Sequence, residues 1–233
     1  MIELLQFPPG AGLMNLSPFC MKVEVFLRLA GLEPRCVNDA TPLRTPKGKL
    51  PVLRDDDRQV ADSAAIVAYL QQRYGAQMPR PLLERETPGL LALRRLIEEH
   101  LYFAMLWLRW VDPPGWAFTA PAFFGGLPPG VRQLVPALVR RKIMRDLRGQ
   151  GMGRHLRDEI IERAVADVGV LAAALGADPF YGGKEPGVID ATAYAFLANI
   201  VWVPLETPVK GAVLAQPELV SYCERMKARV GVA

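Results

Sequence analysis

The run Ser17-Pro18-Phe19-Cys20 is the first place in the chain where residue types and spacing could do chemistry. Serine is a preferred N-cap residue and proline is preferred at the first helical position, so this run predicts a helix start at Ser17. A helix N-terminus presents unpaired N–H groups and a partial positive charge, which stabilise an anion such as a thiolate. A serine hydroxyl there can also donate a hydrogen bond to sulfur. The alternative is that Ser17 only caps the helix and contributes about 1 kcal/mol to stability.

A second cap of this kind stands at Asp62-Ser63. The first N–H groups of the helix that it opens can bind a carboxylate, and the serine hydroxyl adds a donor. Because caps followed by helices are common, this pattern alone does not separate an anion site from a structural cap. Cys20 also leaves two interpretations open, since a cysteine one turn from a cap is either partly activated or a small apolar core residue.

An α/β unit is predicted to carry both caps. Hydrophobic spacing and turn residues indicate the order strand, helix, three strands and helix over the first 75 residues. The strands are expected at residues 2–7, 35–38, 49–53 and 58–61, and the helices after Ser17 and Asp62, closed by Gly31 and Gly75.

The rest of the chain is predicted to be helical. Residues 77–87 have the proline-rich, charged composition of a linker, which divides the chain into residues 1–76 and 88–233. Residues 191–203 are almost wholly apolar, which predicts the buried central helix of a bundle. The prolines from Pro113 to Pro136 exclude one regular helix before about Val131.

Composition excludes several other classes of protein. The net charge of +4 is too small to indicate nucleic-acid binding. The longest apolar stretches, residues 101–111 and 196–205, are about half the length of a membrane span, and the first is interrupted by Arg109. The N-terminus has no basic region of a signal peptide, so we expect a cytoplasmic protein. Three scattered cysteines and two histidines predict neither a disulfide framework nor a metal site.

Three stretches together resemble the glutathione transferase superfamily: Ser17-Pro18-Phe19-Cys20, Lys49-Leu50-Pro51-Val52 and Ala61-Asp62-Ser63. Residues 17–24 and 46–51 are most similar to the branch of metaxins and failed-axon-connections proteins. The resemblance implies an α/β thioredoxin-like N-terminal domain followed by an all-α helical-bundle C-terminal domain, with the active site in the cleft between them.

The resemblance also implies a role for each residue of these stretches. Ser17 would be the catalytic residue that stabilises the glutathione thiolate, with Cys20 as the alternative. A cis Leu50–Pro51 bond would expose the Leu50 backbone to the cysteinyl part of glutathione, and Lys49 could meet its glycyl carboxylate. The γ-glutamyl end would be held by two residues, Ser63 at its carboxylate and Asp62 at its ammonium group.

The second substrate would lie against the helical domain. Aromatic walls suit a hydrophobic electrophile. The candidate residues for contact with this substrate are Tyr102, Phe103 and Trp107. Aromatic residues on a long helix equally pack bundles and dimer faces, so a homodimer is also possible.

The favoured function is therefore that of a glutathione transferase, which uses glutathione as co-substrate and no metal. Two alternatives remain: a non-catalytic metaxin-like adaptor, and a glutathione-dependent thiol transferase using Cys20. The basic segment from Arg132 to Arg157 could touch an acidic membrane surface, although such runs are more often solvated helix faces.

Overall fold

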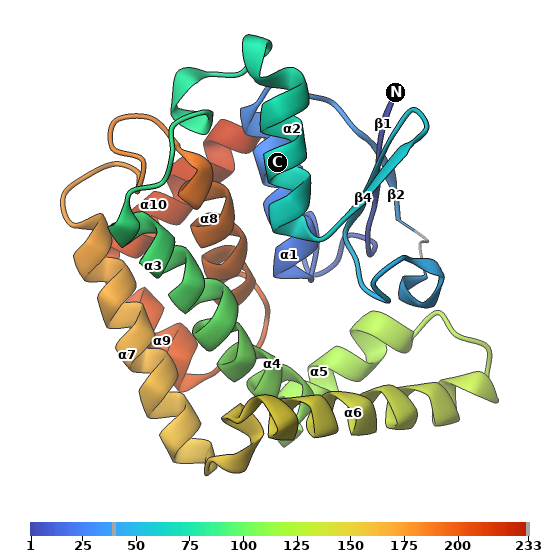
Figure 1. Ribbon diagram of the computed structural model, residues 1–233. Coiled ribbons are helices and arrows are strands. Elements are labelled where there is room, and N and C mark those ends of the chain that lie inside the picture. Colours follow the sequence, from blue (N-terminus) through green and yellow to red (C-terminus); the bar gives the residue numbers. More distant parts are fainter. Residues whose placement is uncertain (39–40, 232–233) are drawn as a thin grey trace.

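The computed structural model describes residues 1–38 and 41–231 and begins with a small mixed sheet (Figure 1). The strands β1 (Ile2–Leu5), β2 (Arg35–Val37), β3 (Val52–Asp55) and β4 (Arg58–Ala61) lie in the order β2-β1-β3-β4. Strand β1 is parallel to β2 and antiparallel to β3, which forms a hairpin with β4. The third strand begins three residues later than the sequence predicts, because Pro51 has no N–H to donate to a strand ladder.

Two helices lie between this sheet and the helical part of the molecule (Figure 1). They are α1 (Pro18–Leu29) and α2 (Ser63–Tyr74), which pack against each other. Helix α1 also packs along α8 (Val188–Val201), so the α/β part and the helical part share one continuous core. Helix α8 is buried from Ile189 to Val201, which confirms the predicted central helix.

The helical part contains a long rod with an irregularity in its middle. Helix α3 (Pro88–Leu96) runs through a π-helical turn (Ile97–Leu101) directly into α4 (Tyr102–Trp110). The remaining helices are α5 (Pro113–Phe124), α6 (Val131–Gln150), α7 (Arg157–Leu175), α9 (Pro208–Leu214) and α10 (Pro217–Val230). Short 3₁₀ turns lie at Pro42–Arg44, Gly75–Gln77, Arg80–Leu82 and Met152–Arg154.

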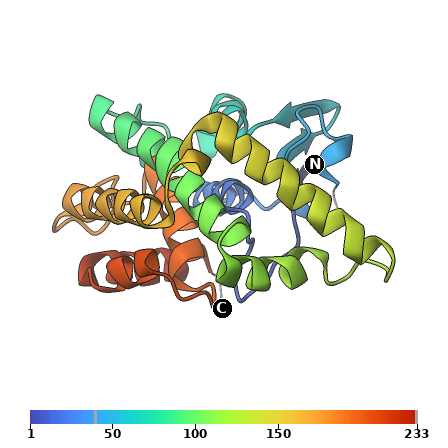
Figure 2. The same ribbon diagram turned by 90° about the horizontal axis from the view of Figure 1, so that it is seen from below.

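A separate helix, α5, precedes Val131 in the proline-rich segment. Pro113 and Pro114 occupy its first two positions, where an N–H would have no partner, so only Pro121 interrupts its interior. Figure 2 shows α6 crossing the lower face of the molecule. None of the helices within the described ranges is long and apolar enough to cross a membrane.

Candidate glutathione site

Ser17 stands at the N-terminus of α1, as the sequence predicts. Its backbone is extended and its side-chain oxygen accepts a hydrogen bond from the Cys20 N–H at 3.4 Å. The Ser17 N–H donates to Asn15 Oδ1 at 2.9 Å, and Asn15 Nδ2 donates to the Phe7 carbonyl at 2.5 Å. Asn15 therefore fixes the cap residue against the end of β1. The Ser17 hydroxyl is only half-buried, so its hydrogen, which faces the Cys20 thiol, can also turn toward a ligand.

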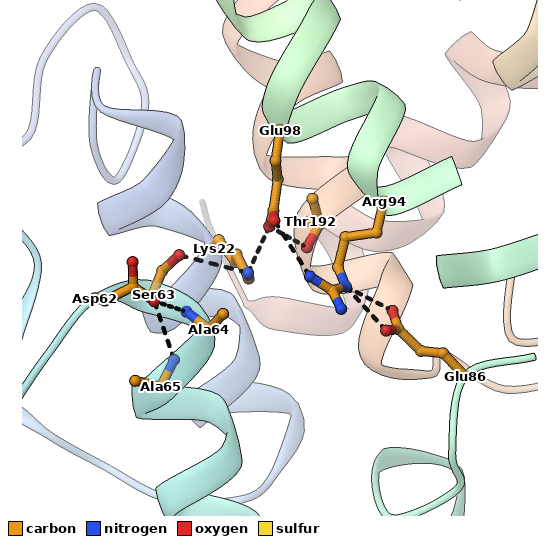
Figure 3. Close-up of polar contacts among 9 residues, drawn as sticks. All are labelled: Lys22, Asp62, Ser63, Ala64, Ala65, Glu86, Arg94, Glu98 and Thr192. Carbon is orange, nitrogen blue, oxygen red and sulfur yellow. Dashed lines mark hydrogen bonds and ion pairs between the residues drawn. The ribbon is translucent and has the colours of Figure 1, made fainter. Parts of the chain in front are cut away.

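Asp62 stands at the matching position of α2. Its Oδ1 accepts hydrogen bonds from the N–H groups of Ala64 at 3.0 Å and Ala65 at 3.1 Å (Figure 3). Its φ of +94° lies in a region that costs a non-glycine residue about 1–3 kcal/mol. Such strain persists only where the surrounding structure enforces it. The side chain is exposed, and Oδ2 has no hydrogen-bond partner in the part of the chain that the structure describes, so it can meet a cationic group.

Ser63 lies next to Asp62, on the side of Lys22, and belongs to a buried polar network (Figure 3). Lys22 Nζ on α1 donates to Ser63 Oγ at 3.4 Å and to Glu98 Oε1 at 2.6 Å. Arg94 Nη1 reaches the other oxygen of Glu98 at 3.3 Å and its Nε binds Glu86. Because Ser63 accepts from Lys22, its own O–H is directed elsewhere and can donate to a ligand.

The Leu50–Pro51 peptide bond is cis, which confirms that prediction. Leu50 is buried in a small cluster with Leu5, Cys20 and Val52, so the segment before β3 lies close to the start of α1. Lys49 is exposed on the turn before it. The Thr45 hydroxyl contacts both the N–H and the carbonyl of Lys49, at 3.0 and 2.9 Å, which holds this turn in place.

Cys20 is fully buried. Burial raises the pKa of its thiol to about 12, against the smaller opposite effects of hydrogen bonds from Ser17 and Phe7. At neutral pH the group is a protonated thiol with no access to solvent. The alternative of Cys20 as the nucleophile of a thiol transferase therefore finds no support, because a thiolate rather than a thiol attacks.

The three aromatic candidates from the sequence are only half-buried, and all three pack on the core. Tyr102 contacts Phe19 edge-on at 4.8 Å and Phe103 at 5.2 Å, and Phe19 packs on Phe196 at 5.3 Å. Burial raises the pKa of the Tyr102 phenol to about 12, so it is neutral at pH 7. Trp107 lies one turn further along α4.

A second aromatic group reaches the Ser17 side from α5. Phe123 contacts Phe7 edge-on at 5.8 Å and Trp110 at 5.6 Å. Phe7 is also the residue whose carbonyl holds Asn15. The aromatic end of α5 thus lies against the loop that carries the cap residue.

A thioredoxin-like sheet with two capped helix N-termini, set against an all-helical bundle, defines the glutathione transferase fold. Models of the glutathione S-transferase N-terminal and C-terminal domains match residues 18–115 and 164–226. The chain belongs to the glutathione transferase superfamily.

Its relatives include a named glutathione S-transferase and proteins that are not named as transferases. It is 33% identical to an isoprene-epoxide glutathione S-transferase of a Rhodococcus strain, over the whole length of both chains. It is 29% identical to failed axon connections of Drosophila melanogaster, covering 97% of this chain and 57% of that one. It is 23% identical to human metaxin-2, covering 89% and 80%.

Among solved structures, a glutathione transferase from Phanerochaete chrysosporium shares the fold with a TM-score of 0.68 at 18% identity, covering 98% of this chain and 96% of that one.

Proposed function

We propose that the protein binds glutathione across the N-termini of α1 and α2 and catalyses the attack of its thiolate on a small hydrophobic epoxide. The observation that carries this proposal is the pair of polar caps on two helices in contact. Ser17 presents a hydroxyl at one cap, and Asp62 presents a free carboxylate oxygen in a strained conformation at the other. The contact of Lys22 with Ser63 fixes the two helix starts relative to each other.

Each end of glutathione has a partner in this arrangement. The γ-glutamyl carboxylate would accept from the Ser63 hydroxyl and the first N–H groups of α2, and the ammonium group would face Asp62 Oδ2. The cysteinyl backbone would lie along Leu50, and the sulfur would accept a hydrogen bond from Ser17. Lys49, which directly precedes Leu50 in the sequence, is the candidate cation for the glycyl carboxylate.

In the reaction, the thiol gives its proton to solvent and the bound thiolate sulfur forms a bond to an epoxide carbon. The carbon–oxygen bond of the ring breaks, and the alkoxide takes a proton from water. The product is a thioether that carries a hydroxyl group on the neighbouring carbon. Ser17 and the N-terminus of α1 lower the free energy of the thiolate, so a larger fraction of the bound glutathione can react at neutral pH.

The epoxide class is taken from the Rhodococcus relative, which matches this chain over its full length. The aromatic side chains of α4 and α5 next to the Phe7 loop would supply an apolar wall for it. Tyr102, Phe103 and Trp107 stay candidates for the same role. A homodimer and a cytoplasmic location remain predictions, as does the division into residues 1–76 and 88–233.

The experiment is incubation of the purified protein with glutathione and a small aliphatic epoxide, with mass-spectrometric detection of the thioether. The expected result is thioether formation above the uncatalysed rate, lowered at least tenfold in Ser17→Gly. Equal rates with and without the protein, for a series of epoxides, would contradict the proposal.

A non-catalytic adaptor is the second candidate, and one observation favours it. Leu134 and Leu138 on α6 are 68% and 66% exposed, beside the unburied cations Arg141, Lys142 and Arg145. Such a face suits contact with another protein or an acidic membrane surface. Retention on immobilised glutathione with elution by free glutathione separates the two, because an adaptor without a glutathione site passes through.

A further inference from the structure

Arg109 is a buried cation whose hydrogen-bond partners are all neutral. It is 8% exposed. Its Nη1 donates to the Leu16 carbonyl at 2.8 Å, and its Nη2 donates to the carbonyl and side-chain oxygens of Asn199 at 2.6 and 3.0 Å. Within the described residues, Tyr102 is the one titratable group that influences the pKa of Arg109, and its phenol is uncharged at neutral pH.

Burial of an unpaired cation costs free energy, so a buried cation in a protein is normally paired with a carboxylate. Burial lowers the pKa of Arg109 to about 10, so the side chain still carries its charge at neutral pH. The interior therefore holds a positive charge that no acidic group among residues 1–38 and 41–231 balances. A field of this kind acts on any anion bound nearby, because a buried charge is poorly screened.

Ser17, the cap residue at which an anion would bind, is close to this charge. The Leu16 carbonyl that Arg109 binds belongs to the peptide bond with the Ser17 nitrogen, so standard bond lengths place the guanidinium within about 5 Å of that nitrogen. Asn199 Nδ2 donates to the Asn15 carbonyl at 3.2 Å. Helices α4 and α8 thus hold both residues that precede the cap.

We infer that Arg109 is a positioning residue of the Ser17 site, which fixes the cap loop and supplies positive charge to the glutathione thiolate. This inference rests on the proposed function. The groups around the site do not cancel the charge. Cys20 on α1 and Tyr102 on α4 are both neutral at pH 7, and Asn199 on α8 is uncharged. Lys22 is paired with Glu98, and Glu24 with Arg28.

The test is the pKa of bound glutathione, followed by thiolate absorbance, in two variants. Arg109→Gln keeps hydrogen-bond donors but removes the charge, and it is expected to raise this pKa by about one unit, a tenfold lower ionisation constant of the bound thiol. Arg109→Lys keeps the charge and is expected to leave the pKa within a few tenths of a unit. A purely structural role would change thermal stability in both variants without separating them in pKa.

Asn199→Asp covers the case in which Arg109→Gln does not fold. This nearly isosteric change sets a carboxylate against Arg109 and neutralises its field, so it is expected to raise the pKa of bound glutathione in the same direction. An unchanged pKa in Arg109→Gln or Asn199→Asp overturns the inference about Arg109 and leaves the proposed function standing. Failure of the wild-type protein to bind glutathione contradicts the proposed function as well.

Discussion

Lys22 Nζ lies 2.6 Å from Glu98 Oε1, and the two side chains are only 2% and 8% exposed. The pair joins α1 to the π-helical turn and lies beside Ser63, which Lys22 contacts (Figure 3). A buried ion pair is expensive to break, because removal of one partner leaves the other as an uncompensated charge. This pair therefore holds the start of α2 in place through its contact with Ser63.

Replacement of Lys22 by Met is expected to lower the free energy of unfolding by about 3 kcal/mol, because Glu98 would keep only Arg94 and Thr192. Urea unfolding measures the loss. The control is Arg80→Met, which removes an ion pair with Glu84 whose side chains are 90% and 62% exposed, and which should cost less than about 1 kcal/mol. Equal losses in the two variants would contradict this prediction.

Ser17→Gly separates catalysis from capping. Glycine is a tolerated N-cap, so thermal stability should change little. Loss of a hydrogen bond to a charged group is worth about 1.5–3 kcal/mol, which should raise the pKa of bound glutathione by roughly one to two units. Titration of the thiolate absorbance checks this. If stability and titration are both unchanged, Ser17 is not the activating residue.

Asp62→Asn tests the glutamyl end without removing the cap, because asparagine caps helices and tolerates positive φ. We expect glutathione to bind about tenfold more weakly, a loss of about 1.4 kcal/mol, because its ammonium group loses a charged partner. Calorimetric titration measures the affinity. The matched ligand is a glutathione analogue without the α-amino group, which should bind both proteins equally. A loss of the same size for both ligands would show that Asp62 does not meet the ammonium group.

The three cysteines should be nearly inert to alkylation in the folded protein. Burial raises the pKa of Cys20 and Cys223 to about 12 and that of Cys36 to about 11. With a pKa near 12, only about one thiol in ten thousand is ionised at pH 8, and the rate should rise with pH. Iodoacetamide labelling mapped by mass spectrometry, with urea-unfolded protein as the control, checks this. Rapid labelling of Cys20 in the folded state would restore the thiol-transferase alternative.

Gly115 should not accept a side chain. A Cβ placed there would lie 1.7 Å from the Leu108 carbonyl oxygen, at the junction between α4 and α5. Gly115→Ala is expected to cost more than about 2 kcal/mol, because the clash is with backbone. The control is Gly149→Ala on α6, where the new methyl group meets nothing within 4 Å and should stabilise the helix slightly. Similar stability of the two variants would contradict the close approach.

The two caps, the central helix α8 and the order of the α/β unit could be predicted because each depends on local sequence. The contacts of Lys22 and Arg109 could not, since their partners Glu98, Leu16 and Asn199 are 76 to 93 positions away in sequence. The sequence does contain a hint. Lys22 falls on the apolar face of α1, and Arg109 interrupts an apolar run, so each predicts a buried charge that needs partners. Which partners they find depends on how the two halves pack.

The π-helical turn at Ile97–Leu101 has a consequence for how this chain could change length during evolution. Glu98 within the turn contacts Lys22 on α1, and Arg109 further along the same rod contacts the loop before α1. Each residue added to or removed from a helix rotates everything beyond it by about 100°. A deletion of one codon within α4, between the π-helical turn and Arg109, would therefore turn the Arg109 side chain away from the loop before α1. Lineages that keep both contacts are expected to keep the number of residues between the π-helical turn and Arg109.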